Sequence, residues 1–304
     1  MAVAQLQPKD YIRQAAPESI RYSETEAMEY TRWLATNHYE NFHVVSILLP
    51  RKLHQDFYNV YSFCRWADDL GDEIGDPAES MRLLSWWRRE LQCMYAGEPQ
   101  HPVFVALQRT VERHEIPVEP FDRLIRAFEQ DQTVTRYQTM DQVFDYCVYS
   151  ANPVGHLVLY LCGYRDKERQ NLSDYTCTAL QLANHWQDVS VDLQKDRVYL
   201  PMDLLAKHGY PLEYLFALKF DDRFRSVMRD AVAVADTLFR QGLPLITKVN
   251  RRLALDLELF SRGGIKILEK IRLQDYNVLQ GRPYISKAER LTLMLRCLPR
   301  LLAF

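Results

Sequence analysis

Helix-start signals recur along this chain of 304 residues and constrain its fold more than any other feature. Ser23 and Glu26 have the spacing of a capping box, and Asp76 before Pro77 is the pattern of an N-cap followed by a first-turn proline. Pro50 is placed to begin the helix between them. There, apolar residues recur at the three- and four-residue spacing of one helix face: Leu53, Phe57, Val60, Cys64 and Ala67.

The whole length can be divided into helices, and no run of residues has the pattern of a strand series. The chain has only 10 glycines, which favours long helices over a many-stranded sheet. We expect helices at these residues: 23–33, 50–73, 77–97, 102–114, 120–133, 139–163 with a kink at Pro153, 173–194, 201–208, 211–218, 221–241, 243–275 weakened at Gly263 and Gly264, and 286 onward. The sequence therefore predicts one all-α domain over residues 1–304, with residues 1–20 as an N-terminal extension.

Composition and charge exclude several classes of protein. The net charge of −2 and the interleaving of basic with acidic residues argue against a nucleic-acid binder. The six cysteines have no metal-binding spacing, which favours a reduced compartment. Neither a signal peptide nor an apolar run of roughly 20 residues is present. We expect a cytoplasmic protein, at most peripheral on the inner face of the membrane. The amphipathic segment 286–304 either lies on that surface or packs on the helical bundle.

Two segments carry paired carboxylates at helical spacing. In CRWADDLGDEIGD (64–76), Asp68 and Asp72 are four positions apart and share a helix face. Asp69 and Glu73 point about 100° away and are expected to be solvated or to support that face, while Asp76 is explained as a cap. In QLANHWQDVSVDLQKDRVYLP (181–201), one face carries two amides and two carboxylates, and Asp196 extends it: Gln181, Asn184, Asp188 and Asp192.

The physical cost of these pairs indicates a cation site. Like charges about 5–6 Å apart repel by on the order of 3 kcal/mol at an effective dielectric constant near 20. A single pair is typical of a solvated helix face, where water and salt screen the repulsion. Two pairs, with an arginine at position 197, suit a diphosphate bound through Mg²⁺, since that ion takes one or two carboxylates together with phosphate oxygens.

YSFCRWADDLGDE (61–73) and QLANHWQDVSVDLQKDRVYLP resemble the two aspartate-rich motifs of the squalene/phytoene synthase family. The resemblance implies a single-domain isoprenoid synthase-type helical bundle with a central active-site cavity. It also implies two facing aspartate-rich helices that hold Mg²⁺, or Mn²⁺ as an alternative, and the substrate diphosphate. The implied metal ligands are Asp68, Asp72, Asn184, Asp188 and Asp192. Residue by residue, the match places these side chains beside the diphosphate: Tyr61, Arg65, Gln181, Arg197 and Tyr199.

Two further stretches resemble the hydroxysqualene synthase branch of the bacterial hopanoid pathway. In HYENFHVVSILLP (38–50), Tyr39 and Asn41 stand where the family usually has diphosphate-binding serines, while His38 fits the family pattern. CVYSANPVGHL (147–157) departs from the family's usual VAGxVG. An enzyme that handles one diphosphate on a C30 substrate can relax one set of phosphate contacts.

The resemblance implies conversion of presqualene diphosphate and water to hydroxysqualene and diphosphate, a lyase reaction without NADPH. Phe42 and Val154 are expected to line the apolar cavity, and either Asn152 or Tyr61 to position the water. Two alternatives remain. One is a presqualene diphosphate, squalene or phytoene synthase acting as a prenyltransferase on prenyl diphosphates. The other is a non-enzymatic helical assembly factor on the same fold.

Overall fold

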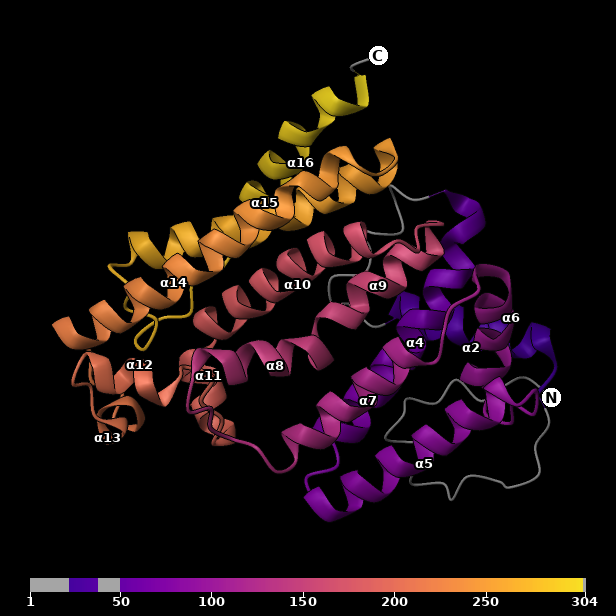
Figure 1. The fold of residues 1–304 in the computed structure, drawn as a ribbon, viewed down its shortest axis with the longest axis horizontal. Helices are drawn as coiled ribbons and strands as arrows, with labels where there is room; N and C mark the ends of the chain where they lie inside the picture. Colours follow the sequence, from indigo (N-terminus) through magenta and orange to yellow (C-terminus); the bar gives the residue numbers. More distant parts are fainter. Residues whose placement is uncertain (1–21, 38–49, 303–304) are drawn as a thin grey trace. The chain divides into compact units, whose positions relative to one another are not determined.

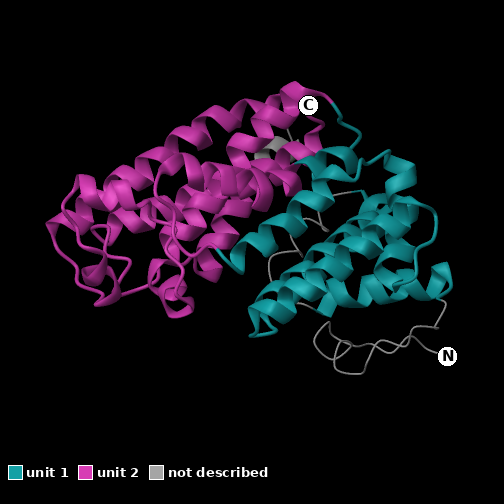
Figure 2. Cartoon of the chain, turned by 60° about the horizontal axis from the view of Figure 1, so that its bottom comes forward, with its two compact units in different colours: residues 1–133, 156–165 teal, residues 134–155, 166–304 magenta. Residues whose placement is uncertain are grey.

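A computed structural model of the chain describes residues 22–37 and 50–302, with side chains described up to residue 295. Every regular element within these ranges is a helix, and the only ladder-type contact there is an isolated bridge between Arg136 and Val198. The all-α class predicted from the sequence is confirmed. The chain forms two compact units, residues 1–133 with 156–165 and residues 134–155 with 166–304 (Figure 2). None of the helices in the described ranges is long and apolar enough to cross a bilayer.

Unit 1 packs around helix α4, which carries the first acidic motif. Its elements are α2 (Glu24–Asn37), η1 (Arg51–Leu53), α4 (His54–Asp72), α5 (Pro77–Tyr95), α6 (Pro102–His114), α7 (Glu119–Asp131) and the second half of α9 (Asn152–Leu161). Helix α4 packs against α2, α5, α6 and α7 (Figure 1). The centre of this packing is aromatic, with the Trp66 and Trp87 rings stacked 5.2 Å apart and Phe63 edge-on to Phe121 at 4.9 Å. The predicted apolar stripe on α4 lies in this core.

Unit 2 packs around helix α10, which leads into the second acidic motif. Its elements are α8 (Met140–Ser150), the start of α9, α10 (Lys167–Gln187), α11 (Val189–Asp192), η2 (Leu193–Lys195), α12 (Met202–Lys207), α13 (Leu212–Phe216), α14 (Asp222–Gly242), η3 (Leu243–Thr247), α15 (Arg251–Leu273) and α16 (Lys287–Leu302). Helices α14 and α15 both pack against α10, and α16 packs on α15 (Figure 1).

The predicted helix starts are confirmed where a side chain provides the cap. Asp76 accepts the amide hydrogen of Ala78 at 3.0 Å, and Pro77 is the first residue of α5. Ser23 and Glu26 form a reciprocal capping box, as do Ser286 and Glu289. These side chains satisfy amides that have no partner within their own helix.

Three predicted helix boundaries are wrong. The segment 139–163 is two helices that break at Ala151, because Pro153 cannot donate a hydrogen bond and so belongs to the first turn of α9. The helix expected from Ser173 begins at Lys167, where Asp166 provides the cap, and ends at Gln187. The segment 243–275 is η3 followed by α15, which begins at Arg251 and continues through Gly264. A Cβ at Gly264 would lie 2.9 Å from Leu180 Cδ2 and closer still to the Phe239 ring. That glycine permits close helix packing and does not weaken the helix.

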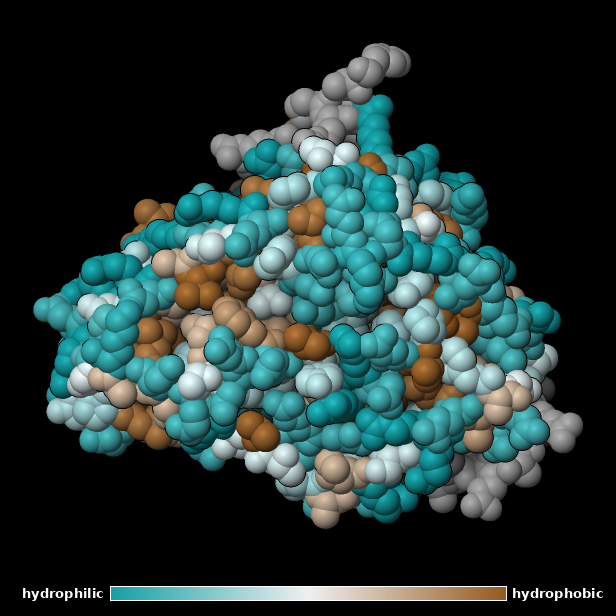
Figure 3. All heavy atoms as spheres, viewed as in Figure 1, coloured by the Kyte–Doolittle hydropathy of each residue, from teal (hydrophilic) through white to brown (hydrophobic). Residues whose placement is uncertain are grey.

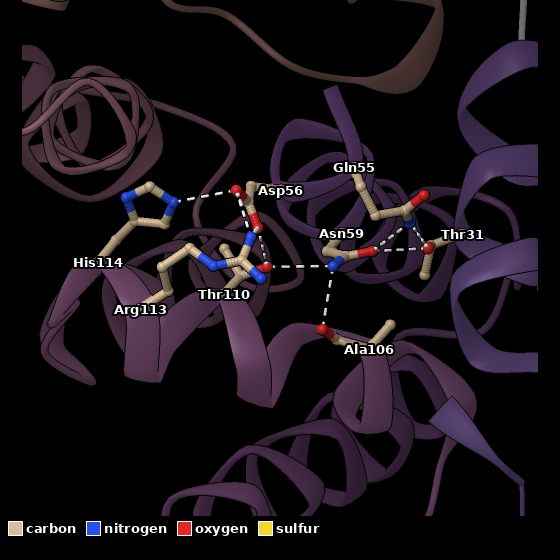
Figure 4. A network of polar contacts seen from close by, with 8 residues as sticks. All are labelled: Thr31, Gln55, Asp56, Asn59, Ala106, Thr110, Arg113 and His114. Carbon is tan, nitrogen blue, oxygen red and sulfur yellow. Dashed lines mark hydrogen bonds and ion pairs between the residues drawn. The ribbon is translucent and has the colours of Figure 1, made fainter. Parts of the chain in front are cut away.

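A buried polar network fixes α4 against its neighbours in unit 1 (Figure 4). The Asn59 carboxamide accepts hydrogen bonds from Thr31 Oγ1 at 2.6 Å and Gln55 Nε2 at 2.9 Å. It donates to the carbonyl of Ala106 and to Thr110 Oγ1, each at 3.0 Å. One side chain therefore joins α2, α4 and α6 in an apolar interior, where such hydrogen bonds are costly to lose.

Replacing Asn59 by alanine should lower the free energy of unfolding by about 3 kcal/mol, because several buried groups lose their partner together. Urea titration followed by circular dichroism measures this. Asn37→Ala is the matched control, since the exposed Asn37 amide donates a hydrogen bond to Trp33 O within its own helix. Equal stability of the two variants would contradict a role for the network in holding α4.

Candidate active site

The first acidic motif lies on the C-terminal half of α4. Tyr61, Arg65, Asp68 and Asp72 follow one another at helical spacing, as predicted. Arg65 Nη1 lies 3.4 Å from Asp68 Oδ2, and the Asp68 side chain is 46% exposed. Burial raises the pKa of Tyr61, which keeps its hydroxyl protonated. This face of α4 thus presents an accessible carboxylate beside a cation and a phenol.

Asp69 is not solvated, which leaves the other expectation for it, that it supports the predicted site. It is buried, and its carboxylate is paired with Arg65. Burial raises the pKa of Asp69 to about 6, although the Arg65 charge opposes that shift. Arg65 therefore divides its guanidinium between a buried carboxylate and an accessible one. Asp69 anchors the arginine that the sequence places beside the diphosphate.

The second motif lies where α10 ends. The helix stops at Gln187, so the predicted row of side chains is not on one uninterrupted helix. The backbone nevertheless keeps the four-residue connection, because the Asp188 amide donates to Asn184 O and the Asp192 amide donates to Asp188 O, both at 2.9 Å. Asn184 Nδ2 also donates to Asp188 Oδ2 at 2.9 Å. The helix break at Asp188 therefore keeps the four-residue backbone spacing of Asn184, Asp188 and Asp192.

Asp196 does not extend this row. It follows the turn of η2 in the left-handed conformation, with φ of 54°, and its carboxylate is paired with Arg136. The same segment makes the isolated bridge between Arg136 and Val198. Asp196 thus helps hold the chain after the motif in place, which is a structural role.

Arg282 is one residue beside the second motif that sequence reasoning missed. Its guanidinium is paired with Asp188 through both carboxylate oxygens, with Nη2 3.0 Å from Oδ2. The adjacent Pro283 accepts a hydrogen bond from the buried Gln187 side chain at its carbonyl oxygen. Ninety-four positions separate Arg282 from Asp188, so no local spacing rule links them. The second acidic motif, motif two, is therefore held by contacts with the segment that connects α15 to α16.

A small pocket adjoins motif two within unit 2. Asp192, Arg197 and Tyr199 line it together with the following residues: His185, Val189, Leu193, Val198, Leu200 and Leu215. The His185 ring stacks on the Tyr199 ring with centroids 3.6 Å apart. Burial, aided by the Arg197 charge, lowers the pKa of His185 to about 3, so the ring is neutral and bonds through Nε2 to Gln181 Nε2 at 3.2 Å. His185 was not predicted as part of the site.

Helix α9 begins with the residues expected to touch the substrate. Asn152 is buried, and its Oδ1 accepts a hydrogen bond from Thr178 Oγ1 at 2.9 Å. Val154 is 44% exposed. A Cβ at Gly155 would collide with the Ser173 and Cys177 side chains, so glycine permits the close packing of α9 on α10. His38, Asn41 and Phe42 lie outside the described residues.

The predicted site residues fall into two groups. Tyr61, Arg65, Asp68 and Asp72 lie together in unit 1. The other described ones lie in unit 2: Asn152, Val154, Gln181, Asn184, Asp188, Asp192, Arg197 and Tyr199. The facing of the two motifs across a cavity stays a prediction.

The donor set of each motif suits a magnesium–diphosphate complex. In the described part of the chain, no three His, Cys, Asp or Glu side chains are grouped to hold a metal ion by themselves. Mg²⁺ commonly takes only one or two carboxylates and completes its shell with water and substrate phosphates. Asp188 Oδ2 already accepts hydrogen bonds from Asn184 and Arg282, but Oδ1 accepts one from Arg282 and keeps a second lone pair for a cation. The residues present therefore fit the ion.

Comparison with known proteins identifies the family. The sequence profile described as squalene/phytoene synthase matches residues 35–289. The chain therefore belongs to the squalene/phytoene synthase family and has its helical fold.

Several relatives and solved structures in this family are similar to the chain. A phytoene synthase of Thermus thermophilus is 32% identical over 259 residues, covering 84% of this chain and 87% of its own. A chloroplastic phytoene synthase of an Oncidium hybrid cultivar is 28% identical, and the chain spans 66% of its length. The crystal structure of squalene synthase HpnC from Alicyclobacillus acidocaldarius is 45% identical with a TM-score of 0.81, covering 84% of this chain and 96% of that one. A dehydrosqualene synthase in complex with a ligand shares the fold, with a TM-score of 0.82 at 22% identity and coverage of 92% and 98%.

Proposed function

We propose that this protein is a hydroxysqualene synthase that converts presqualene diphosphate and water to hydroxysqualene and diphosphate in hopanoid biosynthesis. The observation that carries the proposal is the likeness to squalene synthase HpnC in both fold and sequence. The stretches HYENF and SANPVG support it, since both depart from the family pattern in the direction of this branch.

In this proposal the two motifs hold the diphosphate. Asp68 and Asp72 from unit 1, and Asn184, Asp188 and Asp192 from unit 2, would ligate Mg²⁺. When bound, that ion stabilises the negative charge that develops on the departing diphosphate. Arg65 and Arg197 add fixed positive charge on the protein side, each in the same unit as its motif. Arg282, which is paired with Asp188, would add a third positive charge for the diphosphate.

The reaction then balances without a reductant. The carbon–oxygen bond to the diphosphate breaks, and its electron pair leaves with the phosphate oxygen. The cyclopropylcarbinyl cation rearranges, a water oxygen forms the new carbon–oxygen bond, and the proton is lost to the diphosphate or to solvent. Asn152 is a candidate to position that water because Thr178 fixes its carboxamide. Its remaining amide hydrogens can donate to the water oxygen. No NADPH is required, since no carbon is reduced.

The curated relatives favour one alternative. Several phytoene synthases match most of this chain, so joining two prenyl diphosphates is the competing activity. The decisive experiment offers the purified protein Mg²⁺ with either presqualene diphosphate or a shorter prenyl diphosphate, without NADPH. Mass spectrometry should find hydroxysqualene from presqualene diphosphate alone. Phytoene or presqualene diphosphate formed from the shorter substrates would overturn the proposal.

Arg282→Ala should raise the KM for the diphosphate substrate about 10- to 100-fold, because a hydrogen bond to a charged group is worth about 1.5–3 kcal/mol. Steady-state kinetics measures this. Arg282→Lys should recover part of the loss, since it restores the charge without the bidentate geometry. Arg240→Ala, an exposed arginine on α14, is the matched control. If KM changes less than twofold in Arg282→Ala, Arg282 only holds the connecting segment.

A further inference from the structure

The outward face of α16 is apolar and exposed. Leu291, Met294 and Leu295 follow the spacing of one helix face, and they are 58%, 39% and 54% exposed. The sequence has leucines at positions 298 and 302, at the next three- and four-residue steps. Figure 3 shows one face of the molecule on which apolar residues form small groups among hydrophilic ones, as on most soluble proteins. The α16 residues differ because they follow one another along a single helix.

The inward face of α16 is fixed to α15. Glu289 is paired with Lys270 of α15 at 2.9 Å and closes the capping box with Ser286. Leu293, on the side opposite the exposed stripe, is only partly exposed. The helix is therefore held in a defined rotation, and the stripe of Leu291, Met294 and Leu295 is the side that faces outward.

The charges around this stripe are of one sign. Lys287 and Arg290 are both exposed on the first turn of α16. Residues 287–302 contain two more arginines, at positions 296 and 300, and only one acid, Glu289. That acid is already neutralised by Lys270, so the exposed face offers leucine, methionine and positive charge. This composition is typical of helices that lie in the headgroup region of an anionic bilayer.

The exposed stripe on α16 is also connected to the second acidic motif through the preceding segment of the chain. Arg282 and Pro283 bond Asp188 and Gln187, and Tyr284 follows at once with 66% of its surface exposed. The Tyr284 ring lies 5.7 Å from the Lys270 ammonium group, which also contacts Glu289. The connector that carries Arg282 therefore leads directly into the exposed face of α16.

We propose that the α16 face formed by Lys287, Arg290, Leu291, Met294 and Leu295 docks on the surface of an anionic lipid bilayer. The helix lies flat in the interface, since it is too short and too charged to span. A parallel pairing with a second copy of the chain fits this face less well, because it would bring Lys287 and Arg290 close to their own counterparts. The proposal rests on the proposed function in one respect, since a C30 isoprenoid substrate and an oily product are stored in a bilayer.

Vesicle flotation tests the docking. The full chain should float with vesicles of phosphatidylcholine and phosphatidylglycerol, and much less with phosphatidylcholine alone. Leu291→Gln/Leu295→Gln should reduce the bound fraction at least about tenfold, since two buried leucines are lost from the interface. The matched control is Phe216→Gln/Leu218→Gln, which removes two apolar residues of similar exposure, 43% and 42%, outside α16. Circular dichroism confirms that each variant is folded.

The outcomes separate docking from catalysis. Turnover of substrate dispersed in detergent should be equal in the wild type and in Leu291→Gln/Leu295→Gln, because the change is outside both motifs. Failure of the wild type to float, with turnover intact, overturns the docking and leaves the proposed function. Flotation without product formation from presqualene diphosphate overturns the function and supports the docking. A wild-type dimer that fails to float and becomes a monomer in Leu291→Gln/Leu295→Gln shows that a second copy covers the face, and the proposal is wrong.

Discussion

Asp68→Asn and Asp188→Asn should each lower Mg²⁺-dependent pyrophosphate release by at least about 100- to 1,000-fold while leaving the helix content unchanged. Loss of one group that stabilises charge in the transition state typically has an effect of this size. The asparagine keeps the shape of each side chain and removes only its charge. Asp68 is 46% exposed, and Asp188 lies at a helix end, so neither change leaves a large cavity. A coupled pyrophosphate assay measures the rate.

The matched control for this prediction lies in the same acidic stretch. Asp76 caps α5, and asparagine is an equally good cap, so Asp76→Asn should retain both stability and turnover. Calorimetric titration of Mg²⁺ in the presence of inorganic diphosphate gives a second readout, in which Asp68→Asn and Asp188→Asn should bind more weakly than Asp76→Asn. Turnover retained by either of the first two variants would rule out the proposed metal role for that residue.

The contrast between Asp76 and Asp69 shows what local sequence can predict. The role of Asp76 as a cap depends on its immediate neighbours, and it is confirmed. The burial of Asp69 depends on the helices that pack around α4, among them α2, whose Tyr30 lies near enough to interact with the Asp69 carboxylate. Spacing placed Asp69 off the Asp68 face but gave no information on what covers that side. Arg65 and Asp69 are four positions apart on α4, so their pairing is a local contact that spacing can predict, whereas the burial of the pair depends on the fold.

The same distinction separates the helices from their boundaries. The all-α class follows from periodicity and caps, which are local, and it is confirmed. Helix α10 was placed from Ser173, but Asp166 is an equally good cap seven residues earlier, and tertiary packing decides between them. The pairing of Arg282 with Asp188 was not predictable for a similar reason, since it joins two segments that only the fold brings together.

A buried carboxyl group on α15 gives the second large expected effect. Asp256 is only 3% exposed, and in the described part of the chain neither of its carboxylate oxygens has a hydrogen-bond partner. Burial raises the pKa of Asp256 from 3.8 to about 7, because the charged form loses its hydration. The folded protein therefore holds a proton that the unfolded chain releases at a much lower pH.

This difference sets the sign of the pH dependence. Between about pH 4 and pH 7 the folded state binds more protons at this site than the unfolded state, so stability decreases as the pH rises. The loss is about 1.4 kcal/mol per pH unit, or about 4 kcal/mol over the interval, and it is complete above the folded pKa. Asp256→Asn cannot ionise, so it should match the wild type near pH 4 and exceed its free energy of unfolding by about 4 kcal/mol at pH 8.

Urea titrations of both proteins at one-unit pH steps measure the difference directly. Asp203→Asn, at an exposed position on α12, is the matched control and should change with pH as the wild type does. A constant offset between Asp256→Asn and the wild type at every pH would mean that the substitution changes packing and not ionisation. A difference that grows from pH 4 to pH 7 and then stays level would assign the effect to the Asp256 carboxyl group, because only an ionisation confined to that interval produces this shape.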